Sequence, residues 1–446
     1  MTNSERTTCL VVGGGPAGMV LGLLMARAGV EVTVLEKHAD FLRDFRGDTV
    51  HASTLALLDE LGLGDVFAAM PHRTIDRVQV QLDSGAVQVG DMSRLPGRHK
   101  HIALVPQWDF LDMLADAAEE EPTFTLRRNA EATGLLRDGS RVTGVRYTDR
   151  VTGERHELHA DLTVACDGRG SAVREAAGLI PRSFGVPMDV WWFRLSRRPE
   201  DPTGGVARFS RGHFCVMIDR GDYWQCGYLI SKGTDGALRA AGIEELQRRF
   251  AGLLPWMADR VGELTSWDDV HLLNVRLERL RRWDLDGLLL IGDAAHAMSP
   301  VGGVGINLAV ADAVATARLL APALRGGGTP SRAQLARVQL RRWWPTALIQ
   351  GGQRLVHRAV LGRVLNDPAA AMAATAGTSA PTAPAGMMSS ADIPAAPPAT
   401  LPLPLRLARR FPVLQGIPAR LVAIGPLPEH APDWARRPAR TPAPTP

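Results

Sequence analysis

Short apolar runs end in glycine at three places that lie far apart in the chain. The first run ends at Gly13, the second covers residues 162–166 and precedes Asp167, and the third covers residues 288–291 and precedes Gly292. Continuous apolar runs of this length are typical of parallel strands buried on both faces of a sheet. The pattern predicts one parallel sheet assembled from three distant segments, each strand leading through a glycine turn into a helix.

A second pattern occupies the segments between these runs. Residues 77–89 and 186–231 alternate apolar and polar positions with a period of two, which predicts a largely antiparallel sheet. Its aromatic residues are Trp191, Trp192, Phe193, Phe209, Phe214, Tyr223, Trp224 and Tyr228. Many of them are expected in the core, but a half-buried sheet rich in Trp could also form one wall of an apolar ligand site.

The last quarter of the chain changes character twice. We expect mainly helical structure after residue 320, including residues 331–366. Ala, Pro, Ser, Thr and Gly dominate residues 368–404, which leaves too little apolar surface to offset ordering and predicts a disordered linker. Helical spacing returns in residues 405–428, where we expect a short docking helix.

The first glycine turn has the spacing of an adenine-dinucleotide site. Gly13 permits the tight turn, Gly15 lets the backbone approach a pyrophosphate, and Gly18 lets helix and strand pack closely. Glu36 follows the next predicted strand, 30–35, and can accept hydrogen bonds from a ribose diol. The alternative is a glycine turn that serves helix packing alone.

Composition narrows the class of protein. The chain has 446 residues, enough for two or three domains, and its net charge is +4. Lysine occurs only at Lys37, Lys100 and Lys232, and the many arginines form no long basic block, so we expect a solvated surface and no nucleic-acid partner. The four cysteines lack the spacing of metal ligands, so no metal site is expected.

Two features bear on the cellular compartment. Residues 1–6 are polar and lead directly into the first strand, so we expect no signal peptide and a reduced, cytoplasmic protein. The longest apolar tract, 302–324, carries Asn307, Asp312 and Arg318, which favours an amphipathic helix of a globular protein over a membrane span. No integral membrane association is expected, and the sequence leaves the oligomeric state open.

The motifs occur in a recognisable order. The turn at Gly13 with Glu36 is followed by Phe45-Arg46-Gly47-Asp48, then by Cys166-Asp167-Gly168, and then by the run 292–300. In this order and spacing, residues 7–366 resemble the class A flavoprotein monooxygenases of the para-hydroxybenzoate hydroxylase type. The resemblance implies a cofactor, FAD, and a transient reductant, NAD(P)H, for which the chain has no second glycine fingerprint.

The resemblance also implies a domain organisation within the α/β class. A Rossmann-like FAD-binding domain would be built from the discontinuous segments 1–75, 100–180 and 280–330. An inserted α+β substrate domain would carry the antiparallel sheet in residues 76–99 and 181–279. C-terminal helices would follow in residues 331–366.

Individual residues take roles from the same resemblance. Asp293 would bind a ribityl hydroxyl or cap a helix, and the amides after Pro300 would stabilise the reduced flavin. Arg46 would contact the FAD phosphate or ribityl region, unless it forms a surface ion pair, and Gln107 would cap the ribityl chain. Asp167 would serve FAD and NAD(P)H binding or act as a helix cap. The cofactor-binding candidates are Gly13, Gly15, Pro16, Ala17, Gly18, Glu36, Lys37, Arg46, Gln107, Asp167, Gly168, Gly292, Asp293, Pro300, Gly302, Gly303, Val304, Gly305 and Asn307.

The implied activity is oxygenation. Noncovalent FAD, reduced by NAD(P)H, would capture dioxygen as the C4a-hydroperoxide and pass one oxygen atom to a hydrophobic aromatic or polyketide-like substrate, with water excluded. His51 and His296 are candidate bases near the flavin motifs, but both are expected to be structural. No catalytic residue is assigned.

Other functions compete with this one. An FAD-dependent oxidase or dehydrogenase of a natural-product intermediate would share the fold. Flavin-dependent halogenases are disfavoured, because residues 189–193 lack the GWxWxIP pattern and residues 50–99 contain no lysine. A flavin-binding protein without activity is also disfavoured, because Asp293 and Pro300 are both present.

Overall fold

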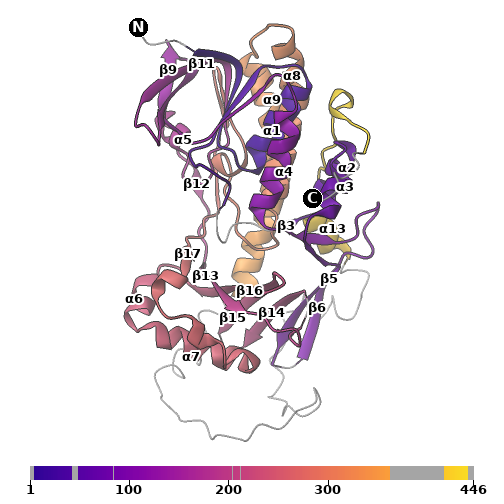
Figure 1. Cartoon of the computed structure of the whole chain (residues 1–446), viewed down its shortest axis with the longest axis vertical. Helices are drawn as coiled ribbons and strands as arrows, with labels where there is room; N and C mark the ends of the chain where they lie inside the picture. Colours follow the sequence, from indigo (N-terminus) through magenta and orange to yellow (C-terminus); the bar gives the residue numbers. More distant parts are fainter. Residues whose placement is uncertain are drawn as a thin grey trace, which may run out of the picture.

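The structure is a computed structural model (Figure 1). It describes residues 5–42, 49–83, 85–202, 204–210, 212–361 and 416–439. The motif with Arg46, the predicted linker 368–404 and residues 405–415 of the predicted docking helix lie outside these ranges.

The largest sheet, called here the β1 sheet, has the order β19-β20-β11-β1-β2-β8, and β10 joins β9 to β11. Strand β1 pairs in parallel with β11 and β2, β11 with β20, and β2 with β8, so the parallel sheet predicted from three distant segments is confirmed. The antiparallel extension by β9 and β10 was not predicted. The strands are β1 Glu5–Val12, β2 Val32–Leu35, β8 Phe124–Arg127, β9 Ala130–Asp138, β10 Arg141–Asp149, β11 Arg155–Ala165, β19 Asp284–Leu285 and β20 Leu288–Leu290.

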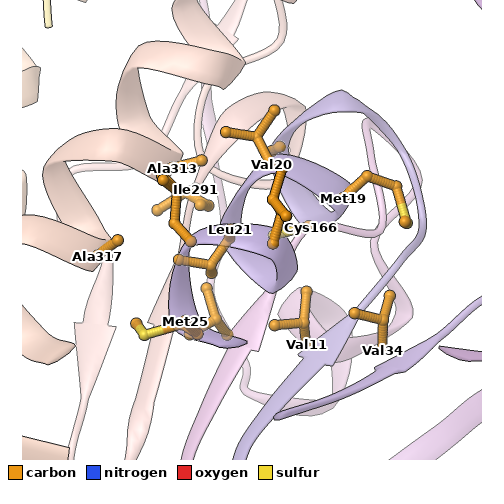
Figure 2. Close-up of a cluster of buried hydrophobic side chains, with 14 of the residues drawn as sticks. Val11, Met19, Val20, Leu21, Met25, Val34, Cys166, Ile291, Ala313 and Ala317 are labelled. Carbon is orange, nitrogen blue, oxygen red and sulfur yellow. The ribbon is translucent and has the colours of Figure 1, made fainter. Parts of the chain in front are cut away.

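Long helices cover the β1 sheet and form the main core with it. Helix α1 (Pro16–Arg27) is buried along nearly its whole length and packs against α8 (Gly305–Arg325) and α4 (Gln107–Glu119). Figure 2 shows the side chains of α1 between the strand residues Val11 and Val34 and the alanines Ala313 and Ala317 of α8. Such small side chains let two helix axes approach closely. Helix α9 (Arg332–Val356) also packs against α8.

The second large sheet, called here the β13 sheet, lies at the opposite end of the molecule from β9 (Figure 1). Its order is β17-β13-β16-β15-β14-β5-β6, and its pairs are antiparallel except for β14 with β5. This agrees with the predicted antiparallel sheet. Its strands are β5 Arg77–Leu82, β6 Gly85–Asp91, β13 Met188–Ser196, β14 Gly205–Ser210, β15 His213–Asp219, β16 Tyr223–Ser231 and β17 His271–Leu273.

Alternate residues of β13 face opposite sides of this sheet, as the pleat requires. Trp191 and Phe193 lie in a core shared with helix α7 (Ile243–Leu253), whereas Trp192 lies in a separate cluster on the other face. The predicted aromatic core is therefore present on one face, and the other face packs in a second cluster that includes Val275 and Val301.

Small elements connect the two large sheets. Strands β3, β7 and β4 form a short sheet, and β12 pairs with β18. The helix α13 lies within the range of the predicted docking helix and contacts β6. The elements are β3 Thr49–Val50, β4 Arg73–Ile75, β7 Ile102–Leu104, β12 Arg182–Ser183, β18 Glu278–Arg279, α2 Ala52–Glu60, α3 Gly64–Ala69, α5 Ala172–Ala176, α6 Asp235–Ala240, α13 Gly416–Ala423, the π-helical turn His357–Leu361, and 3-10 turns Pro255–Met257, Val261–Glu263, Trp267–Asp269, Gly292–Ala294 (η4) and Asp433–Ala435.

Helix α8 is, within the described ranges, the one helix long and apolar enough to cross a membrane by length and composition. Of its apolar window, 61% is buried inside the fold, as in a core helix. The sequence interpretation of its polar residues as an amphipathic pattern is wrong for Asp312, which is fully buried. Its charge is compensated by buried partners, described below.

Candidate active site

The first glycine turn joins β1 to α1 and lies against the end of β11. Gly13 has φ +104°, its N–H donates to Leu35 O over 2.7 Å, and an added Cβ would lie 2.6 Å from Cys166 O. A Cβ at Gly18 would lie 1.9 Å from Gly13 O. Packing within the protein therefore requires glycine at both positions.

Gly15 differs from these two glycines. It has φ −73°, and an added Cβ would meet no protein atom within 4 Å. The protein alone gives no reason for glycine there, whereas a ligand phosphate close to the backbone does. The open space at the amino terminus of α1, which begins with Pro16 and Ala17, thus fits the pyrophosphate of FAD.

Glu36 stands at the end of β2 and is 9% exposed. Its Oε2 accepts from Gly14 N–H over 2.9 Å and its Oε1 accepts from His38 N–H over 3.0 Å. These backbone donors fix the carboxylate beside the turn, and its remaining lone pairs can accept from a ribose diol. Lys37 is exposed, and its carbonyl accepts from Arg150 Nη1.

Asp167 and Gly168 follow β11 and adjoin the same turn. Asp167 Oδ2 accepts from Val173 N–H over 3.1 Å, while Ser171 is the N-cap residue of α5. The Oδ1 of Asp167 is buried and has no hydrogen-bond partner in the described part of the chain. Burial raises the pKa of the Asp167 carboxyl. An acceptor left in this state fits a hydroxyl or amide donor of a bound cofactor.

Gly292 and Asp293 follow β20 and face Asp167's loop. Asp293 lies inside η4, whose N-cap is Ile291, so the helix-cap alternative for Asp293 is wrong. Its Oδ2 lies 3.9 Å from Arg169 Nε, and its side chain is 32% exposed. The carboxylate is therefore accessible to a ligand between the two loops.

The loop from Pro300 leads into α8 as predicted. Gly302 and Gly303 have φ +82° and +63°, and α8 begins at Gly305 after the N-cap Val304. The first amides of a helix carry the positive end of its dipole, which suits the reduced flavin anion.

Residues from β3 and α2 hold this loop in place, and the sequence indicated only His51 among them. Thr49 Oγ1 donates to Gly303 O over 2.8 Å. Asn307 Oδ1 accepts from His51 N–H and Thr54 Oγ1, and its Nδ2 is buried without a partner in the described ranges. Within the described ranges, the Asn307 side chain therefore hydrogen-bonds to the protein through its oxygen, and its nitrogen can still donate to a ligand.

Gln107 is the first residue of α4, as predicted, and is half-buried. Arg174 was not predicted, although it links the two acidic loops. Its Nη1 donates to Ala294 O over 3.0 Å and its Nη2 donates to Arg169 O over 2.7 Å.

Both candidate histidines are buried and contact other residues of the protein. His51 is fully buried, its Nδ1 lies 2.9 Å from Val422 O, and burial lowers its pKa to about 4. His296 is 1% exposed, and its Nε2 lies 2.5 Å from Asp312 Oδ2. Neither has the access that a catalytic base needs.

An aromatic wall adjoins residues 300–304, called here the flavin loop because the sequence predicts that it contacts FAD. Trp192 and Phe214 of the β13 sheet pack in one cluster with Val301, the residue before Gly302. Trp192 lies over Gly227, where an added Cβ would be 2.9 Å from its ring, and its Nε1 is buried with no partner among the described residues. This wall combines apolar surface with one unused hydrogen-bond donor.

Comparisons with known proteins agree with this geometry. The family model "FAD binding domain" matches residues 6–340. The chain is 35% identical, over 72% of its length and 77% of the relative, to 6-methylpretetramide 4-monooxygenase of Streptomyces rimosus.

Solved structures show the same fold. PqsL of Pseudomonas aeruginosa has a TM-score of 0.68 at 20% identity, covering 82% of this chain and 99% of that one. The OxyS anhydrotetracycline hydroxylase of Streptomyces rimosus has a TM-score of 0.68 at 23% identity, covering 94% of this chain and 76% of that one. Within the described residues, no group of His, Cys, Asp and Glu could hold a metal ion. The chain therefore belongs to the FAD binding domain family and is an FAD-dependent oxidoreductase of the monooxygenase type that its motifs resemble.

Proposed function

We propose that the protein uses NAD(P)H and dioxygen to oxygenate a polyketide-like or similarly hydrophobic aromatic molecule. One observation carries the proposal: the loops after β1, β11 and β20 meet at one edge of the β1 sheet, and Val301 joins that edge to Trp192 and Phe214. A cofactor site and an apolar wall are therefore adjacent. The relative 6-methylpretetramide 4-monooxygenase acts on a pretetramide, which supports a fused-ring substrate for this protein.

The cofactor would be held by side chains and amides from all three loops. Gly15 leaves room for the pyrophosphate, Glu36 accepts from the ribose, and Asp293 and Asp167 offer acceptors to hydroxyl or amide groups. When bound, FAD would supply the redox and oxygen chemistry. The amides at the start of α8 would stabilise negative charge on it.

The aromatic wall would orient the substrate and keep water from the reacting atoms. Trp192 and Phe214 offer flat apolar contacts, and the free Nε1–H of Trp192 can donate to a substrate carbonyl or phenolic oxygen. Excluding water favours oxygen transfer over wasteful reaction with solvent.

The deciding experiment measures NADPH and NADH oxidation by the purified holoenzyme with and without tetracyclic aromatic polyketides. We expect substrate-dependent oxidation and a product carrying one atom from labelled dioxygen. A dehydrogenated product without added oxygen would instead identify an oxidase or dehydrogenase. Trp192→Phe should raise KM for the substrate, whereas Trp344→Phe, at a residue 45% exposed on α9, should not.

We further propose that FAD is bound noncovalently. Cys9, Cys166, Cys215 and Cys226 are all buried, and burial raises the pKa of the Cys9 thiol to about 12, which disfavours the reactive thiolate. Acid precipitation should release the flavin into the supernatant. Flavin retained in the pellet would establish a covalent link.

A further inference from the structure

An open cavity of about 260 Å³ lies where the loop after β12 meets the end of α9. None of the predicted cofactor-binding residues lines it. The side chains that define its chemistry are Phe184, Arg354, His357 and Arg358.

Arginine side chains crowd around Phe184. The guanidinium carbons of Arg182, Arg279 and Arg354 lie 5.3, 5.3 and 5.1 Å from its ring centroid. Arg182 and Arg279 also face each other across the β12–β18 pair, a position where like charges destabilise a sheet. Burial and the charges of Arg182 and Arg354 lower the pKa of Arg279. The protein therefore concentrates positive charge here at a cost in free energy.

No carboxylate among the described residues compensates this charge. Arg279 donates to Gln350 Oε1 over 3.2 Å and its guanidinium lies 4.6 Å from the ring centroid of Trp343. None of the arginines at Phe184 or in the cavity lining forms an ion pair within those ranges. Cation–π contacts with Phe184 offset part of the repulsion but neutralise nothing.

Two polar atoms of the lining are also unused. Arg354 Nε and His357 Nδ1 are buried and have no hydrogen-bond partner in the described structure, and His357 is only 3% exposed. Buried polar groups without partners are rare in proteins. Their presence at a positively charged cavity indicates a missing acceptor.

We propose that this cavity binds the phosphate or carboxylate group of a small-molecule ligand. Guanidinium groups match both anions with paired hydrogen bonds. The cavity is near the lower size limit of small-molecule sites, so it suits one charged group and its neighbouring atoms. His357 Nε2 lies 2.9 Å from the Oγ of Ser299, the residue before Pro300, which connects the cavity to the flavin loop.

Two reactants could carry such a group: the nicotinamide dinucleotide through its phosphates, or an acidic aromatic substrate through its carboxylate. The anion site itself does not depend on the proposed function. Only the choice between these sources rests on that function.

Inorganic pyrophosphate is the probe for the site, titrated calorimetrically into the holoenzyme at constant ionic strength. Wild type should bind it, and Arg354→Gln should weaken binding about tenfold or more. Arg337→Gln is the matched control, because Arg337 is an exposed arginine on the same helix and should leave binding unchanged. Arg182→Gln at the exposed edge gives a second test if Arg354→Gln folds poorly. No binding to wild type, or equal affinity in wild type, Arg354→Gln and Arg182→Gln, would overturn the proposal.

Competition identifies the source. Displacement of pyrophosphate by NADPH, with a raised KM for NADPH in Arg354→Gln, would assign the cavity to the reductant. Displacement by salicylate would assign it to an acidic substrate. If neither displaces pyrophosphate, the connection to the reaction is wrong. Because pyrophosphate binding and its displacement are measured without turnover, the test of the anion site is separate from the oxygenation test; only the KM for NADPH comes from turnover.

Discussion

The Nε–H of Arg342 donates to Asp312 Oδ1 over 3.0 Å, and the two side chains are 1% and 0% exposed. Asp312 Oδ2 accepts from Gly292 N–H over 3.1 Å and lies 2.5 Å from His296 Nε2. Arg342 Nη1 lies 3.4 Å from Glu429. Burial would raise the pKa of Asp312, but His296 and Arg342 hold it below its ordinary value. A series of buried charged groups thus links the η4 turn at Gly292 to Glu429 in the C-terminal segment.

Replacing Asp312 with Asn should lower the free energy of unfolding by about 3–5 kcal/mol, because Arg342 would stay buried with a weaker partner. FAD affinity should fall too, since Gly292 would lose a charged acceptor. Urea unfolding and flavin fluorescence titration measure the two effects. Arg248→Gln is the control: Arg248 pairs with Glu245 and the two side chains are 64% and 21% exposed, so its loss should cost under about 1 kcal/mol. Wild-type stability in Asp312→Asn would contradict this account.

The sequence predicts the features of this structure that depend on neighbouring residues, and it does not predict those that depend on residues far apart in the chain. The turn at Gly13 and the loop at Gly302 follow local rules of backbone geometry, so their places were predictable. The roles of Asp312 and Arg342 were not, because each is explained only by a partner on another helix. A carboxylate in the middle of an apolar run was the one available signal, and it suggested an exposed face.

The same limit applies to the site beyond the motifs. Trp192 and Phe214 were noted as aromatic, but the pairing of β13 and of β15 with β16 decides which rings face the flavin loop. The crowding of Arg182 and Arg279 arises from a strand pair nearly a hundred residues apart in sequence. The spacing of residues along the chain does not indicate that these two arginines lie side by side.

Asp293→Ala should weaken FAD binding roughly ten- to more than a hundredfold, because it removes a charge-assisted hydrogen bond of about 1.5–3 kcal/mol. The fold should persist, since the carboxylate is 32% exposed and caps no helix. Titration of the apoprotein with FAD measures the affinity. Asp138→Ala, at an exposed carboxylate ending β9, should bind FAD like wild type. Unaltered affinity in Asp293→Ala would remove its role in binding the cofactor.

Gly15→Ala should lower FAD affinity, whereas Gly18→Ala should lower the stability of the apoprotein. A Cβ at Gly15 meets no protein atom, so the stability of the apoprotein should hold while FAD affinity falls roughly tenfold or more. A Cβ at Gly18 would collide with Gly13 O, so that variant should lose about 2–3 kcal/mol of stability even without FAD. Thermal unfolding of the apoproteins and FAD titration separate the two. Equal FAD affinity in Gly15→Ala and wild type would mean that no ligand approaches this turn.

Stability should fall as the pH drops from 6.5 towards 4, because His51 resists protonation in the folded protein. Its pKa is about 4 when folded, against about 6.5 when unfolded, so the unfolded chain binds more protons in this window. This pKa difference contributes about 3 kcal/mol to the free energy of unfolding. The contribution is fully present above pH 6.5 and is lost by about pH 4.

His51→Gln should flatten this part of the pH profile, since glutamine cannot take up the proton, and its amide can still donate to Val422 O. Urea unfolding of both proteins at several pH values between 7.5 and 4 gives the slopes. His271→Gln, at an exposed position, should keep the wild-type slope. Parallel profiles for wild type and His51→Gln would show that His51 is already protonated, or solvated, in the folded state.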